Sequence, residues 1–237
     1  MIHRNGRRIG ALGIVLVGLL ASYMIGQEAD KPQASKWEND IKAFEQWDAK
    51  NSFPKDAVLF VGSSSIRMWE TAKLFAEYPV INRGFGGAQT SDVNQYVERI
   101  VLPYKPRVIV FYCGVNDIVG GGKTPEQVVS DFKQFLAKVH AALPETPVIY
   151  LSIRLGPAWW PHHPEADRVN AAVREMAQTL ESLHYVDMTT GMLGADGTPE
   201  PSLFLDDQIH LTSQGNSKWA DLLRPTLKKV YEAADKR

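Results

Sequence analysis

Cysteine is nearly absent from this sequence: its 237 residues contain only Cys113. A single cysteine excludes an internal disulfide framework and any multi-cysteine metal site within one chain. An excess of one charge is also missing, because 26 Lys and Arg stand against 27 Asp and Glu, a formal net charge of -1. Binding to nucleic acid or to an anionic surface needs a clustered excess of positive charge, so no nucleic-acid partner is expected. The sequence shows no internal repeat, and its length and 44% hydrophobic content fit one domain with a large core.

A basic cluster occurs only at the N-terminus, in Arg4, Arg7 and Arg8. An uncharged apolar run follows over 9–26, and this order is typical of an export signal or a membrane anchor. The run is long for a signal core and no small-x-small cleavage site follows it, which favours an uncleaved anchor over a removed signal. We therefore expect an exported chain with a signal or anchor over 1–26, a linker over 27–34 and one domain over 35–237. A membrane is expected to contact the N-terminal segment only, with the domain on the periplasmic or extracellular side.

Short apolar runs alternate with longer amphipathic stretches along the domain, and the alternation predicts an α/β fold. The runs that we interpret as strands cover 57–61, 80–82, 108–112, 148–153 and 185–187. Three of them are almost continuously apolar, as strands of a parallel sheet covered on both faces must be. Between them, Thr124, Pro125 and Gln127 predict the start of a helix that runs to about Leu143, and Thr212 is placed to cap the last helix.

Four short segments bring together the residue types of an acyl-transfer site: Gly62-Ser63-Ser64-Ser65-Ile66, Asn82-Arg83-Gly84-Phe85-Gly86-Gly87, Gly114-Val115-Asn116-Asp117 and Asp207-Gln208-Ile209-His210. A serine hydroxyl needs a base that takes its proton, and the base needs a carboxylate that orients it. Ser64, Asp207 and His210 meet this need in a chain order known to work. If the strand order is 2-1-3-4-5, the loops after the first three strands meet at one crevice.

The negative charge of a tetrahedral intermediate calls for preorganised donors. We expect them to be the backbone N–H groups of Ser64 and Gly87 and the side-chain amide of Asn116. Two plainer interpretations stay open: Gly84, Gly86 and Gly87 could serve a tight turn that needs positive φ, and the Asn116 amide could bind its own loop.

The four segments resemble the four blocks of the SGNH hydrolases, also called the GDSL lipase/esterase family, over nearly the whole domain. The resemblance implies a three-layer sandwich with a flavodoxin-like, five-stranded parallel sheet. It also implies that Ser64 is the nucleophile, that Gly87 and Asn116 are oxyanion donors, and that Asp207 and His210 complete the triad. The family's usual aspartate before the nucleophile is Ser63 here.

We therefore predict a serine esterase that forms an acyl-enzyme, with no metal and no organic cofactor. Its substrate would be a small-molecule, glycan or lipid ester. The enzyme would be a small-acyl esterase or a sugar deacetylase. A lysophospholipase or thioesterase, an acyltransferase and a non-catalytic cell-surface binding module are the alternatives. Activity should fall as the pH drops through roughly 6.5, where a histidine ordinarily gains a proton.

Other motifs in the sequence say less about function. Gly120-Gly121-Gly122-Lys123-Thr124 lacks the first glycine of a phosphate-binding loop, and the serine segment lacks the second glycine of a nucleophile elbow. His162 and His163 have no carboxylate at metal-ligand spacing, and Cys113 ends an apolar strand as a buried small side chain would. Trp159 and Trp160 follow the fourth strand and could line a substrate pocket.

Overall fold

The computed structural model of the chain describes residues 36–234, which belong to one compact unit that begins at Lys36. The expected signal or anchor and the linker lie outside the described residues. Among residues 36–234, no helix has both the length and the apolarity that a membrane span requires.

Five parallel strands form the centre of the domain, in the order β2-β1-β3-β4-β5. Their bounds are Val58–Gly62 for β1, Val80–Gly84 for β2, Val108–Tyr112 for β3, Val148–Leu151 for β4 and Leu183–Val186 for β5. Every residue of β1, β3 and β4 is buried, whereas the edge strands β2 and β5 are partly exposed. Coverage of the central strands on both faces explains their unbroken apolar sequence.

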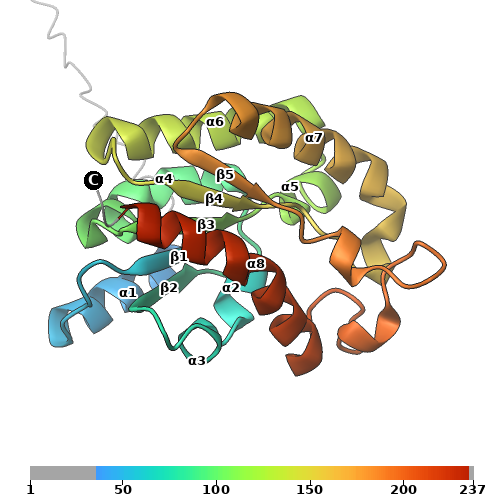
Figure 1. Cartoon of the computed structure of the whole chain (residues 1–237), viewed down its shortest axis with the longest axis horizontal. Helices are drawn as coiled ribbons and strands as arrows, with labels where there is room; N and C mark the ends of the chain where they lie inside the picture. The colour runs from blue at the N-terminus through green and yellow to red at the C-terminus, as the bar shows by residue number, and fades with distance from the viewer. Residues whose placement is uncertain (1–35, 235–237) are drawn as a thin grey trace, which may run out of the picture. The chain divides into compact units, whose positions relative to one another are not determined.

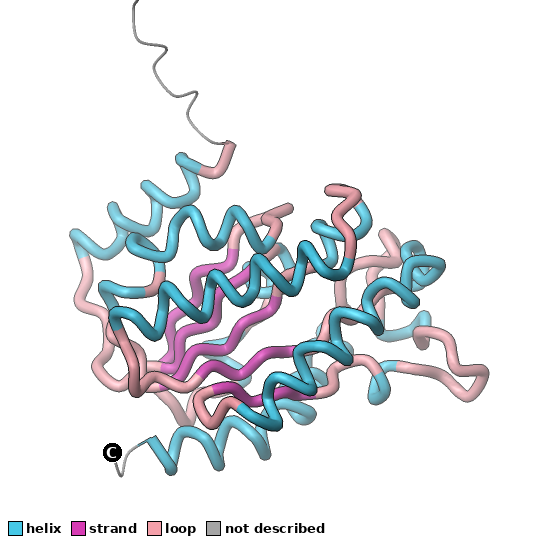
Figure 2. Tube along the Cα trace, turned by 90° about the horizontal axis from the view of Figure 1, so that it is seen from above, coloured by secondary structure: helices cyan, strands magenta, loops and turns pink. Residues whose placement is uncertain are grey.

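Helices cover both faces of this sheet and make three layers (Figure 1). On one face, α1 (Glu38–Lys50), α4 (Thr90–Ile100), α6 (Pro125–Ala142) and α7 (His163–Thr179) pack in sequence, and Figure 2 shows long helices lying above the strands. The helix α8 (Ser213–Ala234) crosses the other face, where its Trp219 is fully buried against Tyr112 of β3. The predicted three-layer α/β sandwich is thus confirmed.

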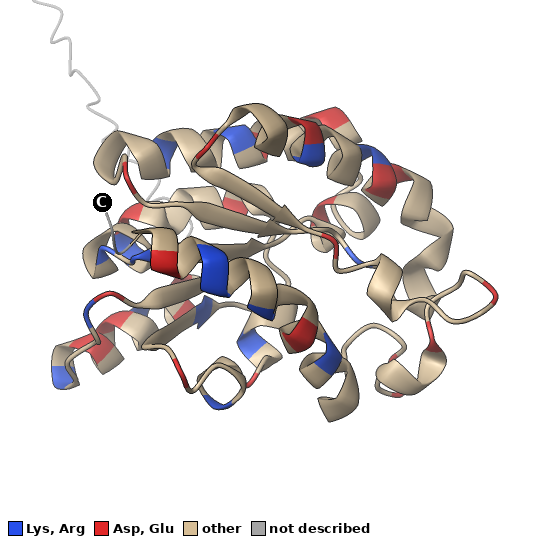
Figure 3. Cartoon of the chain, in the orientation of Figure 1, with Lys and Arg blue, Asp and Glu red and all other residues tan. Residues whose placement is uncertain are grey.

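Short helices fill the remaining connections. They are α2 (Ser64–Met68), α3 (Thr71–Leu74), α5 (Val115–Val119) and the 3-10 turns η1 (Leu102–Tyr104), η2 (Pro157–His162), η3 (Thr190–Met192) and η4 (Pro201–Leu203). Charged residues of both signs are interspersed over the helices, and the strands are largely free of them (Figure 3).

The predicted helix caps form as expected. Thr124 accepts a hydrogen bond from the Gln127 N–H while the Gln127 side chain accepts one from the Thr124 N–H. The Thr212 hydroxyl accepts from the Gly215 N–H in the first turn of α8. The segment around Trp159 and His162 forms the 3-10 turn η2, because Pro157 and Pro161 fix φ near helical values.

Candidate active site

Ser64 lies at the carboxyl end of β1, where it is the first residue of α2. Gly62 adopts a φ of +148° there, and the Ser63 N–H donates to the Tyr112 carbonyl of the neighbouring strand at 3.2 Å. The chain therefore turns sharply from strand to helix. Because the first N–H groups of a helix have no acceptor within it, the Ser64 N–H remains available, and it donates to no other group among the described residues.

His210 contacts Ser64 directly although 146 positions separate them. Its Nε2 lies 2.9 Å from the Ser64 Oγ, and its Nδ1 lies 2.6 Å from an Asp207 carboxylate oxygen. A carboxylate can only accept, so Nδ1 carries the proton and Nε2 is free to accept the serine proton. The three side chains therefore form one continuous hydrogen-bond path.

The Asp207 carboxylate is held ionised. Burial raises its pKa, but hydrogen bonds from the His210 ring and from the N–H groups of His210 and Ile209 outweigh that effect and lower the pKa to about 2. Both of these N–H groups lie 2.9 Å from the second carboxylate oxygen. A permanent negative charge at this position favours the histidine cation that forms on proton transfer.

The loop that carries Asp207 and His210 is closed at its base by an antiparallel bridge between Phe204 and Leu211. Within it, the Leu205 N–H donates to the His210 carbonyl at 2.8 Å, and the Gln208 N–H donates to the Leu205 carbonyl at 2.8 Å. Gln208 takes a left-handed conformation with φ +58°, which lets so short a loop reverse direction.

The two loops expected to supply oxyanion donors lie beside each other. Gly87 has φ +72° and a Cβ built on it would have no atom within 4 Å, so the backbone is open on that side. Its N–H donates to no group among the described residues. The Asn116 amide donates to the Ala88 carbonyl at 2.9 Å, which uses one of its two N–H groups and orients the other.

Of the three glycines for which a positive φ was an open interpretation, only Gly87 has one. Gly84 is needed for space instead, because a Cβ would overlap backbone, whereas a Cβ on Gly86 would meet only the end of a flexible side chain. A Cβ on Gly84 would lie 2.2 Å from the Arg67 backbone nitrogen, and one on Gly86 would lie 3.1 Å from the Arg67 guanidinium.

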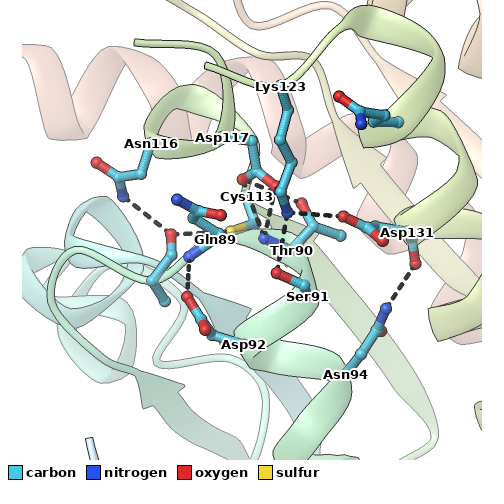
Figure 4. Close-up of polar contacts among 12 residues, drawn as sticks. Gln89, Thr90, Ser91, Asp92, Asn94, Cys113, Asn116, Asp117, Lys123 and Asp131 are labelled. Carbon is cyan, nitrogen blue, oxygen red and sulfur yellow. Dashed lines mark hydrogen bonds and ion pairs between the residues drawn. The ribbon is translucent and has the colours of Figure 1, made fainter. Parts of the chain in front are cut away.

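A buried carboxylate connects the loop after β3 to the start of α4 (Figure 4). Asp117, which is 0% exposed, accepts from the Thr90 N–H at 2.9 and 3.0 Å and from the Lys123 ammonium at 2.9 Å. The same ammonium donates to Asp131 at 2.7 Å and to the Ser91 hydroxyl at 2.9 Å. Lys123 therefore ties the loop after β3 to the start of α4.

Burial and ion pairing shift the pKa values of Asp117 and Lys123 in opposite directions. Burial raises the pKa of Asp117 above its ordinary value, against the opposing effect of Lys123. Burial lowers the pKa of Lys123, but the hydrogen bonds to Asp131 and Asp117 outweigh it and raise the pKa. The lysine of the phosphate-loop-like segment is thus engaged inside the protein.

Arg154 is a residue of this site that the sequence analysis did not identify. The residue is 3% exposed. Its guanidinium lies 5.0 Å from the Phe204 ring centre and 4.9 Å from that of Trp219, and it donates to the Ile209 carbonyl at 3.0 Å. It therefore anchors the loop that carries the histidine. Its position as the one charge in an apolar run at the end of β4 was a signal that could have indicated this role.

A small cavity opens beside Ser64. Trp159 and Arg154 line it together with Asn116 and Tyr112, and its free volume for the centre of a water-sized sphere is about 10 Å³. That is roughly the space that one water molecule needs.

Trp160 is not among the residues that line this cavity. It lies along a separate polar groove and stacks on His163 with ring centres 4.5 Å apart. Neighbouring residues of a 3-10 turn point about 120° apart, which explains why Trp159 and Trp160 line different hollows. Their expected role in a substrate pocket stays a prediction.

The remaining candidates have structural roles. Cys113 is buried, as expected of a small side chain at the end of an apolar strand, and burial raises the pKa of its thiol well above the ordinary value. The His163 Nδ1 is 2.9 Å from the Trp160 carbonyl. Within residues 36–234, no group of three or more His, Cys, Asp or Glu side chains could hold a metal ion.

Known proteins resemble this chain over the segments that build the site. A model of the GDSL-like Lipase/Acylhydrolase family matches residues 61–218. Platelet-activating factor acetylhydrolase IB subunit alpha1 from Pongo abelii is 28% identical over 174 residues, which cover 71% of this chain and 73% of that protein.

Solved structures share the fold. A GDSL-like lipase from Bacteroides thetaiotaomicron has a TM-score of 0.68 at 18% identity and covers 80% of this chain and 98% of its own. An acetyl-xylooligosaccharide esterase from Geobacillus has a TM-score of 0.58 at 16% identity, and the match covers 75% of this chain and 95% of that chain.

Proposed function

This chain belongs to the GDSL-like lipase/acylhydrolase family of ester-hydrolysing enzymes, and we propose that it is a serine esterase that removes small acyl groups through an acyl-enzyme. The observation that carries the proposal is the unbroken path from the Ser64 Oγ to the His210 ring at 2.9 Å and on to Asp207 at 2.6 Å. A nucleophile, its base and the group that orients the base are recognised by this geometry.

In the proposed mechanism the Ser64 Oγ attacks the ester carbonyl carbon while its proton moves to the His210 Nε2. The carbonyl oxygen becomes an oxyanion that accepts from the N–H groups of Ser64 and Gly87 and from the Asn116 amide. The bond to the alcohol then breaks, and His210 returns the proton to the leaving oxygen. A water molecule, deprotonated by the same histidine, attacks the acyl carbon. The bond between that carbon and the Ser64 Oγ breaks, His210 returns the proton to Oγ, and the carboxylic acid leaves.

The size of the cavity supports a short acyl group. Its free volume of about 10 Å³ matches a group of about the size of a water molecule, and an acetyl methyl is closer to that size than any longer acyl chain. The names of two proteins that resemble this chain both refer to acetyl groups, which supports the same substrate class.

Acyl length is tested with nitrophenyl esters. We expect kcat/KM to fall by about tenfold or more from acetate to octanoate, because each methylene beyond the cavity must stay in water or displace packed side chains. A rise in kcat/KM with chain length would instead support the lysophospholipase or thioesterase alternative.

The nucleophile is tested with a fluorophosphonate probe, which labels activated serines. We expect Ser64→Ala to abolish labelling and Ser65→Ala, a change of the same size at the next position, to retain it. If Ser65→Ala removes the label, the nucleophile assignment is wrong. If the folded wild type is not labelled at all, the chain is a binding module and not an esterase.

We also propose that the domain acts outside the cytoplasm, because three arginines precede the apolar run over 9–26. The mass of the protein recovered from a membrane fraction distinguishes a retained anchor from a removed signal. Recovery of the full-length chain from the cytoplasm would contradict export.

A further inference from the structure

Trp37 makes a hydrogen bond to the loop that carries Gly87, from a position well before the segments of the site. Its indole Nε1 donates to the Gly86 carbonyl at 2.8 Å across 49 positions of the chain. Trp37 immediately precedes α1 and lies outside residues 61–218, which match the family model. The contact therefore joins a residue outside the matched segment to a loop inside it.

The Gly86 carbonyl and the Gly87 N–H belong to the same peptide unit. A trans peptide is planar, so its C=O and N–H bonds point in opposite directions. A donor that holds the carbonyl oxygen on one side therefore fixes the direction of the N–H on the other side. The direction of the Gly87 N–H is thus coupled to the Trp37 indole.

This peptide unit needs such a restraint because a glycine lies at each end of it. Glycine populates positive and negative φ about equally, so rotation of the whole unit, which would turn the carbonyl toward the oxyanion, meets little steric resistance. A Cβ at Gly87 would have no atom within 4 Å, so packing against neighbouring atoms does not restrain the backbone on that side.

The indole is itself held in place. Its ring meets the edge of Phe85, which is fully buried, with ring centres 6.0 Å apart and planes at 74°. Phe85 is the residue immediately before Gly86. The Trp37 side chain therefore contacts both the Phe85 ring and the Gly86 carbonyl.

We propose that Trp37 is a positioning residue for the oxyanion site, which holds the Gly87 N–H toward the reacting carbonyl. The inference rests on the proposed function of Gly87. A hydrogen bond accepted by the Gly86 carbonyl also polarises the peptide, which makes its N–H a stronger donor. Both effects act in the transition state, when the oxygen carries its negative charge.

Trp37→Phe tests this role, because it keeps a ring against Phe85 and removes the N–H. We expect kcat on nitrophenyl acetate to fall by about tenfold, a typical effect of one lost hydrogen bond, with KM nearly unchanged. The rate of fluorophosphonate labelling should fall by a similar factor. Benzothienylalanine placed at position 37, which replaces only the N–H by sulfur, should reproduce the loss if the phenylalanine variant does not fold.

Trp47→Phe is the matched control. Trp47 lies in the adjoining helix α1 with 64% of its surface exposed, and its indole donates to no group among residues 36–234. We expect wild-type kcat and KM for this variant, and an equal loss of kcat in both variants would overturn the inference.

Unchanged kcat in Trp37→Phe, or a rise in KM alone, also overturns it. Failure of the proposed function looks different, because Ser64→Ala would then keep the activity of the wild type. Loss of activity in Ser64→Ala together with normal kcat in Trp37→Phe rejects only the role of Trp37.

Discussion

Asp207 accepts three hydrogen bonds, one from the imidazole and two from backbone N–H groups. Replacing it by Asn keeps the size of the side chain but lets an amide N–H face the ring, so the histidine would hold its proton on the wrong nitrogen. We expect Asp207→Asn to lower kcat about 1,000-fold or more, measured with nitrophenyl acetate at pH 7.5. The control is Asp206→Asn, the same change at the preceding exposed position, and a loss below about tenfold in Asp207→Asn would contradict the role.

The low pKa of Asp207, about 2, also links this residue to acid stability. A carboxyl group whose pKa is depressed in the folded state stabilises the fold above its unfolded pKa, near 3.9, and that contribution is lost as the pH falls toward 2. The side chain is 43% exposed, so solvent screening keeps the contribution small. We expect the difference in melting temperature between wild type and Asp207→Asn to be largest at pH 5 and to shrink toward pH 2. A difference that stays constant over this range would contradict the linkage.

Single residues were predictable where chemistry demands a rare combination. Ser64, Asp207 and His210 stand in short polar segments with a spacing that suits one proton path, so the sequence indicated them. Trp37 and Arg154 act through backbone carbonyls of distant loops, and any residue can supply a carbonyl. The single charge in its apolar run singles out Arg154, but no pattern in the sequence points from either side chain to the carbonyl that it contacts.

Among the elements, the end of β1 is the position least tolerant of change. A Cβ on Gly62 would lie 1.8 Å from the Tyr112 carbonyl oxygen, at a φ of +148°. We expect Gly62→Ala to destabilise the fold by about 3 kcal/mol or more, since strain and overlap with backbone act together, measured by urea unfolding. Gly122→Ala, at φ +61° with no atom within 4 Å, should cost only about 1 kcal/mol, and equal losses would contradict the packing argument.

The ion cluster between the loop after β3 and α4 makes a second prediction at this scale. Lys123→Met leaves two carboxylates, those of Asp117 and Asp131, without the ammonium that separates them. We expect the variant to lose about 3 kcal/mol of stability, measured by urea unfolding. Adding Asp117→Asn removes one of the unpaired charges and should restore part of the loss. A double variant less stable than Lys123→Met would contradict this account.

The elements themselves were largely predictable because their signals are local. The cap formed by Thr124 and Gln127 needs only neighbouring residues, and the apolar runs of β1 and β3 reflect burial on both faces. The direction of Trp160 was not predictable, because it depends on a 3-10 turn that the prolines impose on η2. Strand ends differ from the expected ones by at most two residues for a related reason: pairing with a neighbouring strand, and not the strand's own sequence, decides where a ladder stops.

For the whole molecule, the structure predicts that a chain starting at Lys36 folds and works by itself. Residues 36–234 lie in one compact unit, and this unit contains Trp37 and every residue of the proposed mechanism. We expect kcat/KM on nitrophenyl acetate within about twofold of the full chain, since removing a segment outside a packed domain leaves its core intact. A chain that starts at Asn39 lacks Trp37 and should show the lower kcat of Trp37→Phe. Loss of folding in the chain from Lys36 would contradict the domain boundary.

The strand order β2-β1-β3-β4-β5 had been only a condition of the sequence argument. Parallel strands with short connections can adopt only a few topologies. The observed strand order is the one that brings the three polar loops to the same edge of the sheet. The arrangement of loops could thus be predicted from the sequence, whereas the volume left between them depends on side-chain packing and could not.

The bridge between Phe204 and Leu211 gives the base and its carboxylate a common hinge. Because hydrogen bonds within the short loop join His210 to Asp207, we expect warming to separate the imidazole from the serine before it separates the imidazole from the aspartate. Heat inactivation would then begin with a reversible movement of the paired His210 and Asp207 away from Ser64, and cooling would restore the hydrogen bond to Ser64.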